Sequence, residues 1–246
     1  MDISIPPELI RILSQAGRLT ALTGAGVSQE SGLRTFRDAQ TGLWTQYRPE
    51  DLATLQAFER DPQLVWDWYA VRRLRAGEVQ PNPGHYALAE MEHRLPNFTL
   101  ITQNVDGLHQ RAGSARVIEL HGNITRVRCS KGCGLVTAWE EIPDQLPLCP
   151  RCGANLRPDV VWFGESLPRL ALEAAVEAAR NCQVFFSIGT SGVVQPAASL
   201  PYAAGHRGAV VVEINTAETP LSARADFVLI GKSGEVLPEL IRQTWD

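Results

Sequence analysis

Four of the five cysteines form two close pairs with the spacing of a metal site. Three residues separate Cys129 from Cys133, two separate Cys149 from Cys152, and 15 residues lie between the pairs. Thiolates suit zinc, and two such pairs supply four tetrahedral ligands. Because all four ligands are cysteines, we predict a structural zinc ion rather than a catalytic one. Scattered buried thiols or a redox pair are the alternatives, and Cys182 is expected to pack in the core.

His121 lies eight residues before the first cysteine pair, in the run Glu119-Leu120-His121-Gly122-Asn123. An imidazole can act as a general base near neutral pH. Taken alone, such a histidine is more often a core or capping residue. The polar motifs found elsewhere in the chain favour the catalytic interpretation, and the other four histidines have no comparable context.

Short apolar runs alternate with segments that have helical patterns. We expect strands over 18–23, 98–102, 117–120, 184–188, 209–214 and 227–230, and helices over 7–16, 84–94, 168–180, 196–204 and 235–243. Residues 40–80 also read as helical, with aromatic anchors. This alternation predicts a Rossmann-like α/β fold, in which helices cover both faces of a parallel sheet.

Five polar or glycine-rich motifs each follow directly on an expected strand. They are Thr23-Gly24-Ala25-Gly26, Gln103-Asn104-Val105-Asp106, His121-Gly122-Asn123, Gly189-Thr190-Ser191 and Asn215. In open α/β sheets, ligands bind outside the carboxyl ends of the strands. The motifs therefore predict one binding site along that rim.

Each motif also has a reading without a ligand. Gly24 and Gly26 suggest a phosphate cradle, but Gln29 stands where the dinucleotide fingerprint has its third glycine, so a tight turn is the alternative. Asn104 and Asp106 could hold ribose hydroxyls or an amide, or form a turn before Gly107. Phe36 could cover a flat ring or anchor its loop.

Tyr69 and Arg72 are three residues apart on an expected helix, so their side chains share a face. A phenol and a guanidinium together can bind a carboxylate, which arginine grips through two parallel hydrogen bonds. The alternative is a solvated basic face, since Arg73 and Arg75 are adjacent.

The bulk properties are those of a globular protein. Hydrophobic residues make up 44% and charged residues 20%, and the net charge of -4 gives no general attraction to nucleic acid or to an anionic membrane. The sequence shows no membrane span and no signal-peptide pattern at its start. We therefore expect a cytoplasmic protein without specific nucleic-acid or membrane partners.

Taken together, the motifs resemble those of the sirtuins, a family of NAD-dependent protein lysine deacylases, in the family's order over nearly the whole chain. Gly24 to Gly32 with Thr35-Phe36-Arg37 resembles the cofactor loop, Thr102 to His109 the nicotinamide and ribose motif, and His121-Gly122-Asn123 the catalytic histidine motif. The four cysteines resemble the zinc lobe, and Val160 to Glu165 looks like the peptide-binding strand.

The resemblance implies roles for individual residues. His121 would be catalytic. NAD would be bound by Gly24, Ala25, Gly26, Ser28, Glu30, Thr35, Phe36, Arg37, Trp44, Gln103, Asn104, Asp106, Gly189, Thr190, Ser191, Asn215 and Ser233. Acyl-lysine would be bound by Tyr69, Arg72, Val160, Val161, Phe163 and Gly164. Tyr69 and Arg72 are similar to the class III signature, which reads succinyl, malonyl and glutaryl groups.

The resemblance also implies a domain division. Residues 1–39, 80–123 and 158–246 would form the NAD-binding domain, and the insertions 40–79 and 124–157 the smaller lobe with its zinc ribbon. Two features depart from the common pattern: three residues separate Cys129 from Cys133, and Arg34 stands where many members have proline.

The implied reaction transfers the acyl group of a protein lysine to NAD, releasing nicotinamide and 2'-O-acyl-ADP-ribose, with His121 as general base. Deacetylation is expected, together with desuccinylation or demalonylation, by a monomer. Rival readings are an ADP-ribosyltransferase or NAD hydrolase on the same fold, a non-enzymatic module that binds NAD or ADP-ribose, and a zinc-ribbon nucleic-acid binder using Arg126, Arg128 and Lys131.

Overall fold

A computed structural model of the chain describes residues 4–33, 47–138 and 145–246. Its main sheet has six parallel strands in the order β3-β2-β1-β7-β8-β9. These strands are β1 (Leu19–Thr23), β2 (Phe98–Thr102), β3 (Val117–Glu119), β7 (Val184–Ile188), β8 (Val210–Asn215) and β9 (Phe227–Ile230). The predicted parallel sheet is thereby confirmed.

The strand order reverses at β1. From β1 the chain builds outward through β2 and β3, and later through β7, β8 and β9 on the other side. Thr23, at the end of β1, is level with Thr102 of β2 and with Ile188 of β7. A crevice opens at such a reversal, because the connections leave in opposite directions. The fold therefore places its ligand crevice beside Gly24 and Gly189.

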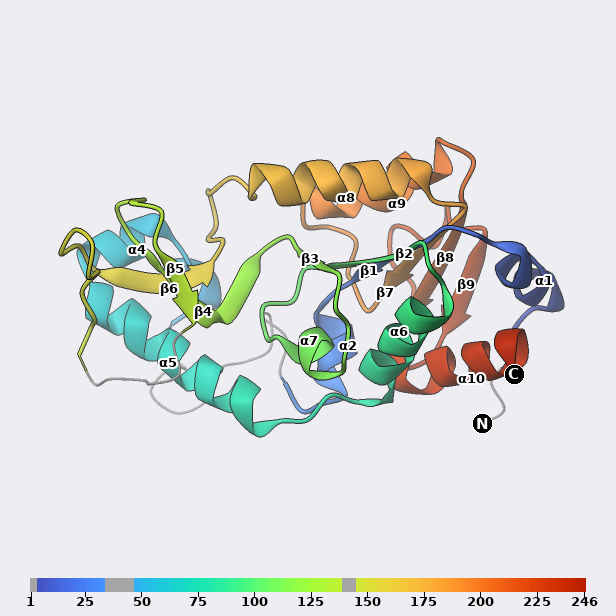
Figure 1. Cartoon of the computed structure of the whole chain (residues 1–246), viewed down its shortest axis with the longest axis horizontal. Coiled ribbons are helices and arrows are strands. Elements are labelled where there is room, and N and C mark those ends of the chain that lie inside the picture. Colours follow the sequence, from blue (N-terminus) through green and yellow to red (C-terminus); the bar gives the residue numbers. More distant parts are fainter. Residues whose placement is uncertain (1–3, 34–46, 139–144) are drawn as a thin grey trace.

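Helices cover both faces of this sheet (Figure 1). One face packs on α1 (Pro7–Gln15), α2 (Ala25–Gln29), α6 (Pro83–Arg94) and α10 (Ser233–Trp245), and the other on α8 (Arg169–Asn181), η2 (Ala197–Ser199) and α9 (Leu200–Gly205). Neighbouring strand residues point to opposite faces, so Ala21 joins the first core and Leu22 the second. Both faces being buried explains why the strands are continuously apolar.

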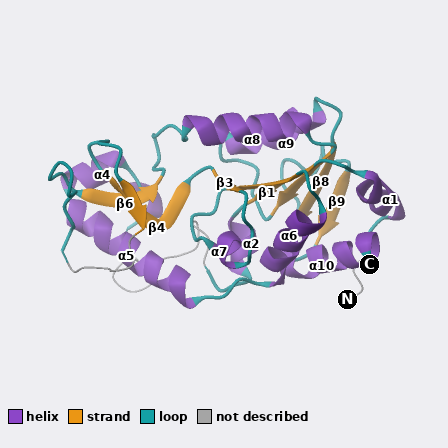
Figure 2. Cartoon of the chain, viewed as in Figure 1, coloured by secondary structure: helices purple, strands orange, loops and turns teal. Residues whose placement is uncertain are grey.

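A smaller lobe lies at the other end of the elongated molecule, on the left in Figures 1 and 2. It contains α3 (Pro49–Leu52), α4 (Leu55–Arg60), α5 (Pro62–Glu78) and an antiparallel sheet, β5-β4-β6, formed by β4 (Gly122–Cys129), β5 (Val136–Ala138) and β6 (Leu156–Val160). The rest of the described chain includes α7 (Leu108–Arg111) after β2. The helical insertion and the cysteine segment thus form one lobe, while the predicted domain boundaries stay a prediction.

The expected elements differ from the structure in local ways. The described part of the expected helical segment 40–80 is three helices, because Thr54 and Asp61 each cap a new helix and Pro62 begins α5. Of the segment 160–165, which resembles a peptide-binding strand, Val160 ends β6 and Phe163 forms an isolated parallel bridge with Thr54, while its role in binding a peptide stays a prediction. The chain turns at its end: the Glu165 N–H donates to the Trp162 carbonyl at 3.0 Å, and Gly164 has φ +84°.

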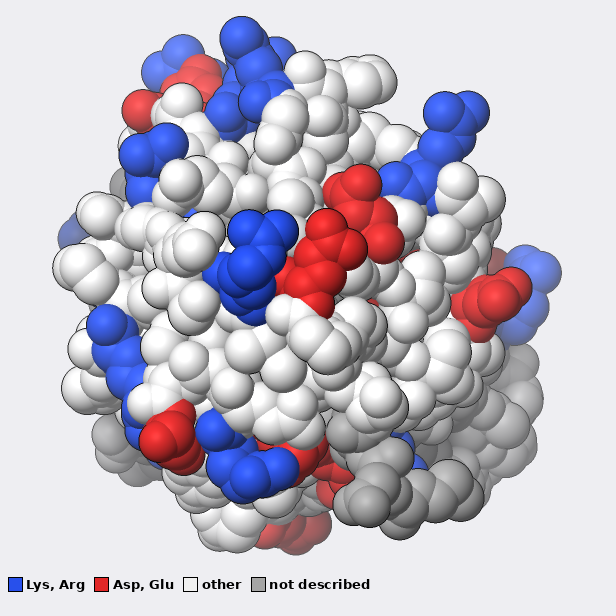
Figure 3. All heavy atoms as spheres, turned by 90° about the vertical axis from the view of Figure 1, so that its right-hand side faces the viewer, with Lys and Arg blue, Asp and Glu red and all other residues white. Residues whose placement is uncertain are grey.

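Within the described residues, no helix is long and apolar enough to span a membrane. Charges of both signs alternate on the end face of the larger lobe, which Figure 3 shows without a continuous basic patch. Arg94 at the end of α6 pairs with Glu90 and Asp246.

Candidate functional site

A cleft of about 780 Å³ lies between the rim of the main sheet and the smaller lobe. The loops after β1, β2, β3, β7 and β8 line one side, and α5 with the segment after β6 lines the other. A second hollow of about 510 Å³ shares Gly26, Gly189 and Asn215 with it. The two hollows therefore adjoin at the strand reversal.

Apart from the four cysteines, every predicted site residue in the described part of the chain lines one of the two hollows. The cleft takes Gly24, Ala25, Gly26, Ser28, Tyr69, Arg72, Gln103, Asn104, Asp106, His121, Val160, Val161, Phe163, Gly164, Gly189, Thr190, Ser191 and Asn215, and the second hollow takes Glu30 and Ser233. Thr35, Phe36, Arg37 and Trp44 lie outside the described residues, as does Arg34.

The glycine loop after β1 packs directly on the loop after β7. The Gly26 N–H donates to the Gly189 carbonyl at 2.8 Å, and the Gly24 N–H donates to the Ile188 carbonyl at 3.0 Å. A Cβ on either glycine would lie 2.8 Å from the Gly189 carbonyl oxygen. Close packing of two loops is thus one reason for these glycines, and their own amides are already engaged within the protein.

Ser28 is the centre of a hydrogen-bond network under the cleft. Its hydroxyl donates to Asp106 Oδ2 at 2.7 Å and accepts from Asn104 Nδ2 at 3.0 Å. Asn104 Nδ2 also lies 3.0 Å from the Gly24 carbonyl. Burial raises the pKa of Asp106, partly offset by the Leu108 N–H and the Ser28 hydroxyl. The network holds α2 and the loop after β2 in a fixed relation.

Two buried histidines extend this network. The Asn82 N–H donates to His85 Nδ1, so the His85 proton is on Nε2, which lies 3.4 Å from Ser28 Oγ. His109 packs on His85 with ring centroids 4.9 Å apart and lies 2.9 Å from Thr23 Oγ1. Burial lowers the pKa of His85 to about 4 and, with His85 as neighbour, that of His109 to about 3. Both rings are neutral at pH 7.

His121 sits between β3 and β4, at the junction of the two sheets. Its Nδ1 lies 3.0 Å from the Gln103 carbonyl oxygen, which can only accept a hydrogen bond. The proton is therefore on Nδ1, and Nε2 carries a lone pair. Burial lowers the pKa of His121, and the bond to the Gln103 carbonyl partly offsets this shift. The neutral ring lines the cleft as a proton acceptor.

Tyr69 and Arg72 approach the cleft from α5 on the opposite side. Tyr69 is 3% exposed, and the Arg72 guanidinium lies over the Trp68 ring at 4.8 Å from its centroid. Burial lowers the pKa of Arg72, with Arg75 adding to the effect, while burial raises that of Tyr69. The alternative interpretation, in which these side chains belong to a solvated basic face, is therefore wrong for Tyr69 and Arg72. It is also wrong for Arg73, which is buried and donates to the Ile124 carbonyl.

The segment after β6 forms the remaining wall. The Val161 N–H donates to the His121 carbonyl, and the Phe163 N–H donates to the Ala53 carbonyl, both at 2.9 Å. The Phe163 side chain is 49% exposed, and Ala53 lines the cleft. These two bonds connect the segment to the rim of the main sheet and to the smaller lobe.

Polar contacts also hold the loops after β7 and β8 in place. Gln103 Nε2 donates to Thr190 Oγ1 at 3.0 Å, and Asn215 Nδ2 donates to the Thr190 carbonyl at 2.9 Å. Glu30 accepts from the Ser233 hydroxyl at 2.6 Å and from the Gly234 N–H, which joins α2 to α10. The Glu30 carboxylate, which lines the second hollow, is therefore already paired within the protein.

The four predicted metal ligands lie together at the end of the smaller lobe. Their sulfur atoms are all within 4.8 Å of one another, with Cys129 and Cys152 at 3.5 Å and Cys133 and Cys149 at 3.5 Å. A tetrahedron with zinc–sulfur bonds of about 2.3 Å has edges of about 3.8 Å. The donor set fits structural zinc, held by Cys129, Cys133, Cys149 and Cys152, and the cluster lies apart from the residues that line the cleft.

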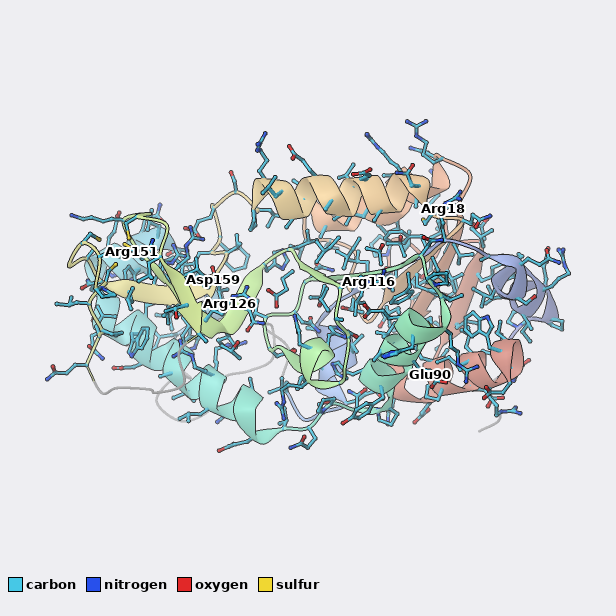
Figure 4. All side chains as sticks on the ribbon, in the orientation of Figure 1. Arg18, Glu90, Arg116, Arg126, Arg151 and Asp159 are labelled. Carbon is cyan, nitrogen blue, oxygen red and sulfur yellow. The ribbon has the colours of Figure 1, made fainter. Side chains whose placement is uncertain are left out.

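Two basic residues of this lobe, Arg126 and Arg128, are paired with acids. Arg126 on β4 bonds Asp159 on β6 at 2.9 Å and Glu119 at 2.6 Å, and Figure 4 shows Arg126 beside Asp159. Arg128 lies 3.9 Å from the same aspartate. This neutralisation counts against a zinc-ribbon surface for nucleic acid.

Comparison with known proteins identifies the family. The Sir2 family model matches residues 24–196. The chain belongs to the Sir2 family. It is 55% identical over 214 residues to an NAD-dependent protein deacylase of Aquifex aeolicus, covering 85% of this chain and 87% of that one.

Solved Sir2 structures share its fold. A Sir2 homologue in complex with NAD has a TM-score of 0.93 at 49% identity, covering 98% of this chain and 94% of the other. A Sir2 homologue variant in complex with 2'-O-acetyl-ADP-ribose has a TM-score of 0.91 at 50% identity, covering 98% and 96%. NAD and structural zinc therefore fit this Sir2-family chain.

Several residues at the candidate site have no local signal in the amino-acid sequence. His85 and His109 have no context in the sequence that points to the site, yet His85 lies 3.4 Å from Ser28 Oγ and His109 packs on His85. Trp162 was read only as part of a motif, but its indole contacts Tyr69 from a different element. Ala53 belongs to none of the sequence motifs, yet it lines the cleft. A contact between distant segments leaves no trace in local spacing, so the fold alone reveals these residues.

Proposed function

We propose that this chain removes acyl groups from protein lysines with NAD as co-substrate, giving nicotinamide and 2'-O-acyl-ADP-ribose. The observation that carries the proposal is the placement of neutral His121, with a free Nε2 lone pair, in one cleft with the rim motifs and with Tyr69 and Arg72. Family membership and the names of its relatives support the same activity.

The protein residues have distinct tasks in this reaction. NAD, when bound, would supply the ribose that accepts the acyl group and the nicotinamide that leaves, and one water molecule is consumed as the lysine amine is freed. His121 Nε2 takes a proton from a ribose hydroxyl, which makes that oxygen a better nucleophile. Asn104 and Asp106 orient the ribose and carboxamide, while Ser28 keeps both side chains in place. Gly189, Thr190 and Asn215, which line the cleft, would hold the rest of the dinucleotide together with Glu30 and Ser233 of the second hollow.

We further propose that acidic acyl groups such as succinyl, malonyl and glutaryl are accepted alongside acetyl. Arg72 and Tyr69 lie on the wall opposite His121, where they can bind a carboxylate at the end of the acyl chain. Ala53 lines the same cleft and leaves room, because its side chain is a single methyl group. Val160, Val161, Phe163 and Gly164 form the wall along which the peptide backbone binds.

Release of nicotinamide tests the activity. The protein with NAD should release nicotinamide only when an acyl-lysine peptide is added, and His121→Ala should lower this rate at least about 100-fold while staying folded. Chromatography of nicotinamide measures both. Equal release without peptide identifies an NAD hydrolase, no release identifies a binding module, and full activity of His121→Ala removes the base assignment.

Substitution of Arg72 tests the acyl class. Arg72→Met keeps an apolar stem but removes the charge, so kcat/KM for a succinyl-lysine peptide should fall at least about tenfold more than for the acetyl peptide. Arg169→Met is the matched control, because Arg169 is an exposed arginine on α8 that does not line the cleft. Equal losses on both peptides in Arg72→Met would contradict the assignment.

We also propose a cytoplasmic monomer that acts on acyl-lysine proteins. Thiols that serve as metal ligands suit a reducing compartment. Size-exclusion chromatography with light scattering should give 27.0 kDa, and a mass of twice that value would contradict the monomer.

A further inference from the structure

Tyr69 makes one hydrogen bond that its proposed role does not explain. The indole Nε1–H of Trp162 donates to the Tyr69 hydroxyl oxygen at 3.0 Å. Trp162 is 2% exposed and Tyr69 3%. The two residues come from different elements, since Tyr69 is on α5 and Trp162 follows β6. The bond is therefore a tertiary contact in a site shielded from water, where a hydrogen bond has more influence than at the surface.

The indole is held firmly in place. The Arg157 guanidinium lies 3.4 Å from the Trp162 ring centroid, and Phe58 packs against the ring with centroids 5.3 Å apart. Arg157 is held in turn by Glu165 through bonds of 2.6 and 2.8 Å, and Glu165 also accepts the Trp162 backbone N–H at 2.8 Å. The indole N–H is thus a fixed donor that cannot rotate away.

A fixed donor determines where the phenol proton points. A phenol has two favourable in-plane positions at its oxygen, which its own proton and one accepted hydrogen bond share. Because the indole N–H occupies one position, the Tyr69 O–H is turned to the other. Burial raises the pKa of Tyr69, so the phenol keeps that proton at neutral pH and remains a donor. Tyr69 and Trp162 both line the cleft beside Arg72.

We propose that Trp162 is a positioning residue for acyl selectivity: its indole N–H turns the Tyr69 hydroxyl proton toward the carboxylate of an acidic acyl group. This inference rests on the proposed function and deepens it. A carboxylate is bound more tightly by two charge-assisted hydrogen-bond donors, namely Arg72 and the Tyr69 O–H, which is already oriented before the acyl group binds. An acetyl group has no carboxylate, so it gains nothing from the orientation.

The substitution Trp162→Phe tests the proposal, because it keeps an aromatic ring for Arg157 and Phe58 but removes the N–H. The ratio of kcat/KM for succinyl-lysine over acetyl-lysine, measured on matched peptides, should fall about fivefold or more, mainly through KM for the succinyl peptide. A merely structural role would lower both activities alike and leave the ratio unchanged.

Two further variants sharpen the experiment. Tyr69→Phe should lower the same ratio, and Trp162→Phe in that background should lower it by less than about twofold more, because the hydroxyl it orients is already gone. Trp66→Phe is the matched control, since Trp66 is another fully buried tryptophan, packed with Cys129 and Cys149, and its loss should leave the ratio unchanged.

The outcomes separate this inference from the proposed function. If the wild-type protein removes succinyl groups but Trp162→Phe leaves the ratio unchanged, the positioning role alone is overturned. The same holds if the two substitutions lower the ratio independently in the double variant. A wild-type protein that removes acetyl but not succinyl groups overturns the proposed acyl class, and the role of Trp162 falls with it. If Trp162→Phe does not fold, the ratio in Tyr69→Phe decides, and an unchanged ratio there overturns the proposal.

Discussion

His121 has its Nδ1 proton committed to the Gln103 carbonyl, so the reactive nitrogen is Nε2. The neutral form is the active form of a general base, and burial lowers the pKa of this ring. A lowered pKa keeps the imidazole neutral down to a pH below its ordinary value of about 6.5. The environment thus favours the form that catalysis needs over the whole neutral range.

This tautomer and burial predict the acid side of the pH profile. As pH falls, kcat/KM for deacylation should decline with a midpoint below about 6.5, because His121 becomes protonated only there. Steady-state rates between pH 5 and 8 measure it, with thermal unfolding at each pH as the control for loss of fold. A midpoint above 7 would contradict a buried, neutral base.

Residues at the carboxyl ends of the parallel strands line the cleft as expected, while their roles stay a prediction. Asn104, Asp106, His121 and Asn215 were found because parallel strands bring their carboxyl ends to one rim. His85 was not predicted, because it meets Ser28 only through the packing of α6 on α2. The position of Gly26 was predicted, but not the close approach of the Gly189 carbonyl, which belongs to another loop.

At the scale of elements, the junction between β4 and β6 joins the smaller lobe to the rim. Gly122 begins β4 beside Val160 at the end of β6, with φ +81°. A Cβ at Gly122 would lie 2.0 Å from the Asp159 carbonyl oxygen. The two strands can therefore approach each other, directly after His121, only with glycine at this position.

Gly122→Ala should consequently destabilise the protein by at least about 2 kcal/mol, through both the left-handed backbone and the clash. Gly208→Ala is the matched control, since Gly208 has φ +85° and an added Cβ there meets nothing within 4 Å. It should cost only about 1 kcal/mol, the backbone contribution alone. Denaturant unfolding compares the two, and equal losses would show that the close approach is unimportant.

The helices and strands were largely predictable from the hydrophobic pattern and from the proline and glycine residues at their ends. All six strands of the main sheet were expected, because both faces are buried and each strand is a short apolar run. The segment 160–165 resembles a peptide-binding strand, but in the structure only Val160 belongs to β6, and Phe163 forms an isolated bridge with Thr54. The turn at its end follows from Gly164 and from the Glu165 carboxylate that binds the Trp162 N–H, a local bond that propensity does not include.

At the scale of the whole molecule, the cysteine cluster and the cleft are separate sites joined by one lobe. The zinc ligands pack with Trp66 on α5, the helix that also carries Tyr69 and Arg72. Metal binding therefore supports the wall of the cleft through α5 while contributing no group to the chemistry. A zinc ribbon folds with its metal, so removing one thiolate weakens the lobe.

Cys149→Ser should accordingly lower the zinc content below one ion per chain and lower Tm by at least about 5 °C. Cys182→Ser is the matched control, because Cys182 is buried between α8 and β7, away from the other four cysteines. It should keep its zinc. Elemental analysis together with calorimetry measures both, and full zinc occupancy in Cys149→Ser would contradict the ligand assignment.

The central claim is that His121 and the rim residues transfer an acyl group from lysine to NAD. Mass spectrometry of reactions with NAD and matched peptides carrying acetyl-, succinyl-, malonyl- or glutaryl-lysine tests it most directly. We expect unmodified lysine peptide and equal amounts of nicotinamide and acyl-ADP-ribose, with the acidic acyl groups among those removed. Intact acyl peptides across the whole panel, or ADP-ribose attached to the peptide, would contradict it.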